Sequence, residues 1–213
     1  MIPTFIRIIK KKILHQLVRY IVWDFDGTLY QCRNLELALE AKYFHYYRER
    51  CETISLPAFK KLSDYHGSWS TVIARHLKTS EYKIINAVER KFNKAQYVVR
   101  NDSIVQLVNS LSDYQHIIFS NSSKRQIIQG LKNIGFSKAT RDNPKPFLLI
   151  IDRHAMMSIK PHPHSFQFLL KQTKAKPYQH LIIGDSWHHD IIPAKKYGFQ
   201  AIHISELETF FHL

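Results

Sequence analysis

The stretch Val22-Trp23-Asp24-Phe25-Asp26-Gly27-Thr28-Leu29 closes an apolar run near the start of the chain and decides how the rest is interpreted. The apolar run predicts a buried strand, and Gly27 predicts where that strand ends. Because successive strand residues point to opposite faces, we expect Asp24 and Asp26 to point the same way. Two neighbouring carboxylates on one face repel each other unless a cation lies between them or one of them holds a proton. The pattern therefore indicates a cation or acid–base site, or more simply an acidic strand end in water.

The composition is that of an ordinary globular protein. Of the 213 residues, 45% are hydrophobic and 23% are charged, which excludes a disordered or fibrous chain. The formal net charge of +14 favours anionic partners such as phosphorylated metabolites, nucleic acid or an acidic membrane surface, and a solvated basic surface explains it equally well. The two cysteines, Cys32 and Cys51, form no disulfide framework. We therefore expect free thiols and a cytoplasmic location.

The N-terminal segment 6–19 mixes basic and apolar residues. Its charges exclude a membrane span, and it lacks the charged-then-apolar order of a secretory signal. A basic amphipathic helix can lie on a membrane surface, but packing of its Ile and Leu side chains on the core is the simpler expectation. We therefore predict no transmembrane segment.

Residues 31–103 follow a different pattern from the rest of the chain. They form successive amphipathic helical segments, whereas strand-like and helical segments alternate afterwards. The alternation predicts an α/β fold, with a Rossmann-like parallel sheet core, helices on both faces and an inserted all-helical cap. We expect residues 1–30 and 104–213 to form the core and residues 31–103 the cap. The later strands are predicted at 115–119, 147–151, 180–183 and 200–204. Since ligands of such sheets bind beyond the carboxyl ends of the strands, polar residues at those ends are site candidates.

Three later stretches place polar residues after predicted strands or before a helix. Ser120 and Asn121 follow one strand, and a helix cap is the simpler interpretation of this pair. Lys160 opens the stretch Lys160-Pro161-His162-Pro163-His164-Ser165-Phe166, where an exposed lysine is the usual alternative. A further strand is followed by Gly184-Asp185-Ser186-Trp187-His188-His189-Asp190-Ile191. The adjacent histidines of this last stretch point in different directions, which argues against a zinc site.

These stretches together resemble the four motifs of the haloacid dehalogenase superfamily of phosphohydrolases, in the same order. The first matches D-x-D-G-T-L, Ser120 supplies the second motif, and the others match K-P-x-P-x-x-F and G-D-S-x-x-x-D-I. The resemblance covers the chain from about Arg19 to Ser205, and a helical insert between the first two motifs is typical of a phosphatase branch with a mobile cap. In two departures, Pro193 stands where glycine is common, and the segment 136–160 is longer than the compact pattern. The longer segment leaves the course of the third strand open.

The resemblance implies a role for each motif residue. Asp24 would attack phosphorus to form an aspartyl-phosphate, and Asp26 would protonate the departing alcohol and then activate water. The presence of Asp26 argues against dehalogenation, because dehalogenating members lack this second aspartate. An Mg²⁺ cofactor is implied, held by Asp24, the carbonyl of Asp26 and Asp185, with Asp190 bound to the ion or just behind it. The residues implied to bind the phosphoryl group are Thr28, Ser120, Asn121 through its amide, and Lys160.

The function implied by the resemblance is a Mg²⁺-dependent phosphatase that hydrolyses a small phosphate monoester. Phosphoglycolate-like acids, sugar phosphates and nucleoside monophosphates are all open as substrates. In the cap, the loop His66-Gly67-Ser68-Trp69 is the candidate for substrate contact, and an ordinary turn between helices is the alternative. A phosphomutase similar to β-phosphoglucomutase is a second possible function. A non-catalytic nucleic-acid-binding protein is a third, and the complete set of motif residues argues against it. The sequence makes no prediction of oligomeric state.

Overall fold

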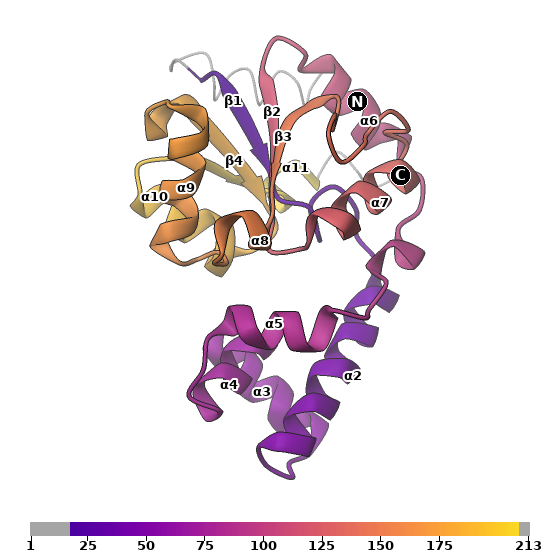
Figure 1. Ribbon diagram of the computed structural model, residues 1–213, viewed down its shortest axis with the longest axis vertical. Helices are drawn as coiled ribbons and strands as arrows, with labels where there is room; N and C mark the ends of the chain where they lie inside the picture. Colours follow the sequence, from indigo (N-terminus) through magenta and orange to yellow (C-terminus); the bar gives the residue numbers. More distant parts are fainter. Residues whose placement is uncertain (1–17, 209–213) are drawn as a thin grey trace. The chain divides into compact units, whose positions relative to one another are not determined.

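The computed structural model describes residues 18–208 and contains a five-stranded parallel sheet (Figure 1). Its strand order is β3-β2-β1-β4-β5. The strands are β1 (Tyr20–Trp23), β2 (Gln115–Phe119), β3 (Phe147–Ile151), β4 (His180–Gly184) and β5 (Gln200–His203). Trp23 pairs with Ile118 of β2 and with Ile183 of β4, so the carboxyl ends of the three central strands lie at one edge. The predicted parallel sheet is confirmed. Of the segment 6–19, residues 6–17, and with them the predicted N-terminal helix, lie outside the described residues.

Helices cover both faces of the sheet, as predicted. Figure 1 shows α9 (Pro163–Thr173) and α10 (Ile192–Lys196) on one side, and α6 (Asp102–Ser110) and α7 (Lys124–Ile134) on the other. On the first side, one buried cluster combines side chains of the sheet with side chains of the helices; its members include Val22, Ile117, Ile182, Phe166, Leu169 and Ala194. Fully burying an aliphatic or aromatic side chain of this kind stabilises the fold by roughly 1.5–3 kcal/mol.

A buried histidine fixes the packing on the other face. The indole N–H of Trp23 donates to Nδ1 of His116 (3.0 Å), so Nε2 of His116 carries the proton and donates to the carbonyl of Leu111 at the end of α6 (3.0 Å). Burial lowers the pKa of His116, which keeps the ring neutral. This chain of hydrogen bonds joins β1, β2 and the end of α6.

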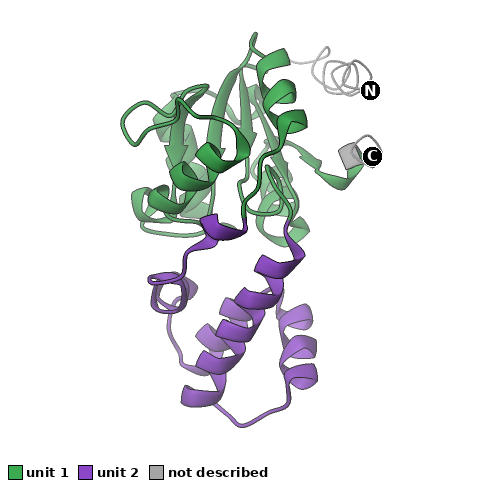
Figure 2. Cartoon of the chain, turned by 90° about the vertical axis from the view of Figure 1, so that its right-hand side faces the viewer, with its two compact units in different colours: residues 1–31, 98–213 green, residues 32–97 purple. Residues whose placement is uncertain are grey.

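The chain divides into two compact units (Figure 2). The first unit contains the chain up to Gln31 and from Val98 onward, and the second contains Cys32–Tyr97. The two boundaries predicted from the sequence lie after residue 30 and after residue 103. The segment 98–103 lies in the sheet-containing unit; it includes the first two residues of α6, which packs beside α7.

The second unit is entirely helical among its regular elements. It consists of α2 (Arg33–Arg50), α3 (Leu56–His66), α4 (Trp69–His76), α5 (Glu81–Glu89) and a 3₁₀ turn (Lys94–Tyr97). Ser55, Ser68 and Ser80 accept hydrogen bonds from the first turns of α3, α4 and α5, which explains where these helices begin. Its core is rich in aromatic residues, including Tyr43, Tyr47 and Phe59. Throughout residues 18–208, no helix combines the length and the apolar character that crossing a bilayer requires.

Candidate active site

Asp24 lies at the carboxyl end of β1, in the middle of the sheet. Its backbone N–H donates to the carbonyl of Ile183 (2.9 Å), so the ladder between β1 and β4 continues one residue beyond Trp23. The residue is 7% exposed. Burial raises the pKa of Asp24 to about 6, with a further contribution from the Asp190 carboxylate, although the Lys160 ammonium opposes the rise. Asp24 is therefore a buried carboxyl whose ionisation depends on positive charge beside it.

Lys160 supplies this positive charge. Its ammonium donates to Oδ1 of Asp24 (2.8 Å) and to Oδ1 of Asp190 (2.5 Å), and only 2% of the residue is exposed. Burial alone would lower the pKa of Lys160, but the carboxylates of Asp190 and Asp24 outweigh this effect and raise it above the ordinary value. The ammonium also lies 5.2 Å from the ring centre of Phe119, at the end of β2. Lys160 therefore remains charged although it is buried.

Asn121 holds the backbone of this lysine from both sides. Its side-chain amide donates to the carbonyl of Lys160 (3.0 Å), and its side-chain oxygen accepts from the N–H of Lys160 (2.8 Å). The Asn121 carbonyl in turn accepts from the guanidinium of Arg153 (3.0 Å), a residue that is 2% exposed. The side chain of Asn121 thus positions Lys160. The phosphate contact predicted for Asn121 concerns its backbone amide and not this side chain. Arg153 was not predicted from the sequence as a site residue; the available signal was a charged residue two positions after an apolar strand.

Three carboxylates converge at this edge of the sheet. Asp24, Asp185 and Asp190 each offer an oxygen, and these oxygens lie within 4.8 Å of one another. Burial raises the pKa of Asp185 to about 8, with the neighbouring charges of Asp24 and Asp190 contributing. With Lys160 as the counter-charge, the group has two negative charges in excess when all its members are ionised. Within residues 18–208, no other group of three or more histidine, cysteine or acidic side chains could hold a metal. A hard divalent cation such as Mg²⁺ fits this all-oxygen set.

Two glycines allow the carboxylates to approach the backbone. Gly27 has φ +78°, and a Cβ placed there would lie 2.1 Å from Oδ2 of Asp185. A Cβ on Gly184 would lie 2.5 Å from Cγ of Asp190. Asp190 itself sits in the π-helical turn Trp187–Ile191, where its Oδ2 accepts from the N–H of Ser186 (3.2 Å). Both positions therefore require glycine, and Gly27 requires it for its backbone conformation as well.

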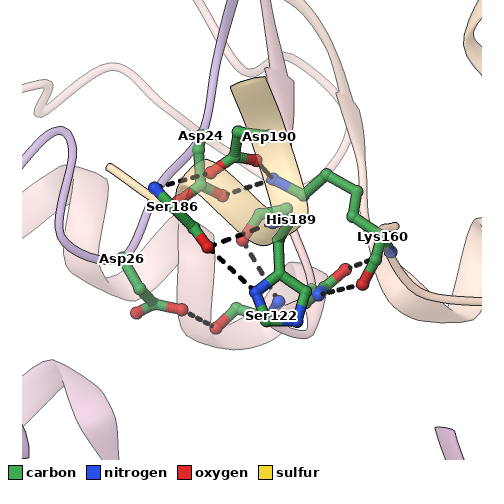
Figure 3. A network of polar contacts seen from close by, with 9 residues as sticks. Asp24, Asp26, Ser122, Lys160, Ser186, His189 and Asp190 are labelled. Carbon is green, nitrogen blue, oxygen red and sulfur yellow. Dashed lines mark hydrogen bonds and ion pairs between the residues drawn. The ribbon is translucent and has the colours of Figure 1, made fainter. Parts of the chain in front are cut away.

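Asp26 lies outside this group of carboxylates. Because β1 ends at Trp23, the alternation of strand side chains does not determine where Asp26 points. Tyr30 donates from its hydroxyl to Oδ1 of Asp26 (2.5 Å), and Ser122 donates to Oδ2. Figure 3 shows the Asp26 carboxylate directed toward Ser122, beside the network that joins Asp24, Asp190 and Lys160. Neither Tyr30 nor Ser122 was a sequence candidate, although each stands close to a motif residue.

The hydroxyl groups of Thr28 and Ser120, which the sequence predicts to bind phosphate, are both buried. Thr28 lies two residues after Asp26, and Ser120 lies two residues before Ser122. Thr28 is 4% exposed, and its hydroxyl has no hydrogen-bond partner among the described residues. Because an unsatisfied buried hydroxyl costs about 1–3 kcal/mol, it is a candidate for contact with a bound group. Ser120 is 1% exposed, and its hydroxyl accepts from the N–H of Ser122 (3.1 Å). The proton of the Ser120 hydroxyl can therefore still be donated to a ligand.

The four loop residues predicted to contact substrate lie in the helical unit, at the turn between α3 and α4. Gly67 ends α3 with φ +89°, and Ser68 begins α4 by accepting from the N–H of Thr71 (3.1 Å). His66 is the last residue of α3, and Trp69 packs against Tyr43 with ring centres 5.7 Å apart. Helix capping accounts for the glycine and the serine, and the part these residues play in substrate binding stays a prediction.

Comparison with known proteins identifies the family. The sequence profile of the haloacid dehalogenase-like hydrolases matches residues 21–204. The chain belongs to this family. It is therefore a hydrolase, and the membership inferred from the four motifs is confirmed. The matched segment spans both units, from β1 to the end of β5.

Several known proteins resemble this haloacid dehalogenase-like hydrolase along most of their length. The pyrophosphatase PpaX of Bacillus mycoides is 24% identical over 194 residues, which cover 88% of this chain and 84% of that protein. CbbY from Rhodobacter sphaeroides, solved in complex with phosphate, has a TM-score of 0.59 and 16% identity, covering 87% of this chain and 85% of that one. YfnB from Bacillus subtilis, solved bound to magnesium, has a TM-score of 0.53 and 16% identity. The match covers 86% of this chain and 85% of that one. At these identities the two structures show a shared fold.

Proposed function

We propose that this hydrolase is a Mg²⁺-dependent phosphatase that acts on small phosphate monoesters through an aspartyl-phosphate on Asp24. The observation that carries the proposal is the buried contact of Asp24 with Lys160, beside Asp185 and Asp190. A nucleophilic carboxylate needs nearby positive charge to receive a phosphoryl group, and a lysine at 2.8 Å supplies it. The pyrophosphatase name of one relative and the phosphate bound to CbbY support chemistry at phosphorus.

The reaction has two steps. In the first, an oxygen of Asp24 attacks phosphorus, the ester P–O bond breaks, and the leaving oxygen takes a proton from Asp26. In the second, Asp26 takes a proton from water, the water oxygen attacks phosphorus, and the bond to Asp24 breaks. Phosphate is released, and both carboxyl groups return to their starting forms. Lys160 balances charge on the phosphoryl oxygens, and the hydroxyl of Ser120 donates to them.

The residues that would hold a magnesium ion are Asp24 and Asp185 through their carboxylate oxygens, Asp26 through its backbone carbonyl, and Asp190 either directly or from just behind the other ligands. The structure supports this set because the three carboxylates bring excess negative charge to one place and Gly27 leaves room for Asp185. A bound Mg²⁺ neutralises the charge that develops on the phosphoryl oxygens and offsets repulsion between phosphate and carboxylates.

We propose further that the helical unit 32–97 acts as the cap and contributes substrate specificity through the loop 66–69. A cap favours small substrates such as phosphorylated metabolites over phosphoproteins. We also propose a cytoplasmic location, because both Cys32 and Cys51 are free thiols.

The test is hydrolysis of 4-nitrophenyl phosphate by the full chain, with and without Mg²⁺, followed by a panel of metabolites that includes inorganic pyrophosphate. We expect activity that requires magnesium and falls at least about 1,000-fold in Asp24→Asn, since covalent catalysis is lost. Asp113→Asn, which removes an exposed carboxylate from the same unit, should leave the rate unchanged. A fully active Asp24→Asn would refute the assignment of the nucleophile.

A further inference from the structure

The carboxylate of Asp26 is held at both of its oxygens by hydroxyl groups that the four motifs do not include. Tyr30 donates to Oδ1 (2.5 Å) and Ser122 donates to Oδ2. Both donors are buried, with 5% of Tyr30 and none of Ser122 exposed. Figure 3 shows the contact between Asp26 and Ser122 beside the Asp24 and Lys160 network. The two oxygens of Asp26 thus have defined partners before any substrate is bound.

The two donors are themselves held by neighbouring groups. The ring of Tyr30 packs edge-on against Phe25, with ring centres 5.2 Å apart and planes at 62°. The N–H of Ser122 donates to the hydroxyl of Ser120 (3.1 Å), and its carbonyl accepts from the N–H of Arg153 (3.4 Å). Tyr30 lies four residues after Asp26, whereas Ser122 lies 96 residues away in the sequence. The turn after β1 and the loop after β2 therefore set the plane of one carboxylate together.

We propose that Tyr30 and Ser122 are positioning residues for the proton transfers of Asp26; this inference rests on the phosphatase function proposed above. Proton transfer requires the donor and acceptor atoms to approach within hydrogen-bond distance, so an error in the orientation of the carboxylate lowers the rate directly. With both oxygens tied to donors that are buried and packed, Asp26 keeps one orientation through both steps. Neither hydroxyl needs to contact substrate for this role.

The role has a chemical signature in the first step. When the ester P–O bond breaks, its electron pair stays on the leaving oxygen, which then takes the proton of Asp26. A strongly basic leaving group needs this proton during bond cleavage, whereas a weakly basic one such as 4-nitrophenolate can leave without it. Loss of a positioning residue for Asp26 must therefore slow phenyl phosphate more than 4-nitrophenyl phosphate, two esters of nearly the same shape. A merely structural defect slows both esters alike.

The experiment compares kcat/KM for phenyl phosphate and 4-nitrophenyl phosphate in Tyr30→Phe and Ser122→Ala. We expect a loss of roughly 10-fold or more on phenyl phosphate and of less than about 3-fold on 4-nitrophenyl phosphate. Asp26→Asn should show the same selectivity in stronger form, and adding Tyr30→Phe to it should have no further effect. Equal losses on the two esters, or full additivity with Asp26→Asn, would overturn the proposal.

Two matched variants serve as controls. Tyr20→Phe removes a phenol hydrogen bond to the carbonyl of Thr173 (3.4 Å) at the opposite end of β1, and Ser63→Ala removes a buried hydroxyl from α3. Both should leave the ratio of the two rates unchanged. The tyrosine and serine variants probe different segments, so either one tests the proposal if the other unfolds. If wild type is inactive on both esters, or Asp24→Asn is active, the phosphatase function itself fails; selectivity missing only in Tyr30→Phe and Ser122→Ala overturns the positioning role alone.

Discussion

Replacement of Asp185 by asparagine should stabilise the metal-free protein and abolish its stabilisation by magnesium. Burial, together with the charges of Asp24 and Asp190, raises the pKa of Asp185 from 3.8 to about 8. The folded state therefore binds a proton more tightly than the unfolded chain, and stability is lost as the pH rises through this interval. Asparagine removes the negative charge and keeps nearly the same shape. The metal-free fold then no longer has to bind a proton at this position, or to bear the repulsion among three carboxylates where Asp185 is ionised.

The size of the effect follows from the pKa of Asp185. A carboxyl whose pKa rises from 3.8 to about 8 costs on the order of 4 kcal/mol of folding free energy at pH 7. Asp185 is partly exposed to solvent, which screens its interactions, so we expect about half of this, roughly 2 kcal/mol. For a chain of this size, 1 kcal/mol corresponds to about 2–4 °C in Tm. The variant should therefore melt roughly 4–8 °C above wild type without metal.

The assay is thermal unfolding of the full chain at pH 5 and pH 8, with EDTA or with millimolar Mg²⁺. In EDTA the advantage of Asp185→Asn should be larger at pH 8 than at pH 5, because the cost of taking up a proton at Asp185 on folding increases with pH between the unfolded pKa of 3.8 and the folded pKa of about 8. Magnesium should raise the Tm of wild type and leave that of the variant unchanged. Asp113→Asn, at an exposed position, is the control and should follow wild type. A variant that is less stable than wild type at pH 8 in EDTA, or that still gains stability from magnesium, would refute the reasoning.

Three further variants test other contacts. Asn121→Ala releases the backbone of Lys160 and should lower kcat roughly 10- to 100-fold in steady-state assays; an unchanged kcat would exclude the positioning role. Because burial lowers the pKa of His116, the free energy of unfolding should fall as the pH drops below about 6.5. In urea denaturation, His116→Gln should make the free energy of unfolding depend less on pH in this range. A pH dependence as steep as that of wild type would contradict the role assigned to His116. Gly27→Ala should cost more than about 2 kcal/mol and remove the stabilisation by magnesium, because its Cβ collides with Asp185; normal magnesium stabilisation would argue against that collision.

The sequence by itself determined the architecture of the sheet-containing unit. Apolar runs such as that of β4 alternate with amphipathic helices, and this local pattern predicts a parallel sheet covered on both faces. The sequence motifs also placed Asp24 and Asp185 directly after central strands, and Lys160 shortly before a helix. These features could be predicted because the hydrophobic periodicity, the glycines at the ends of strands and helices, and the order of the motifs are all visible in the sequence itself.

Only the tertiary structure decided which polar groups meet. Asn121 binds the backbone of Lys160 across 39 residues, and Ser122 reaches Asp26 across 96. Such contacts depend on the register of β1 against β2 and of β2 against β3, and on the turn that follows Trp23, where strand alternation no longer applies. A buried hydroxyl or amide takes the partner that three-dimensional packing brings within hydrogen-bond distance, and residues far apart in the chain carry no local mark of that pairing.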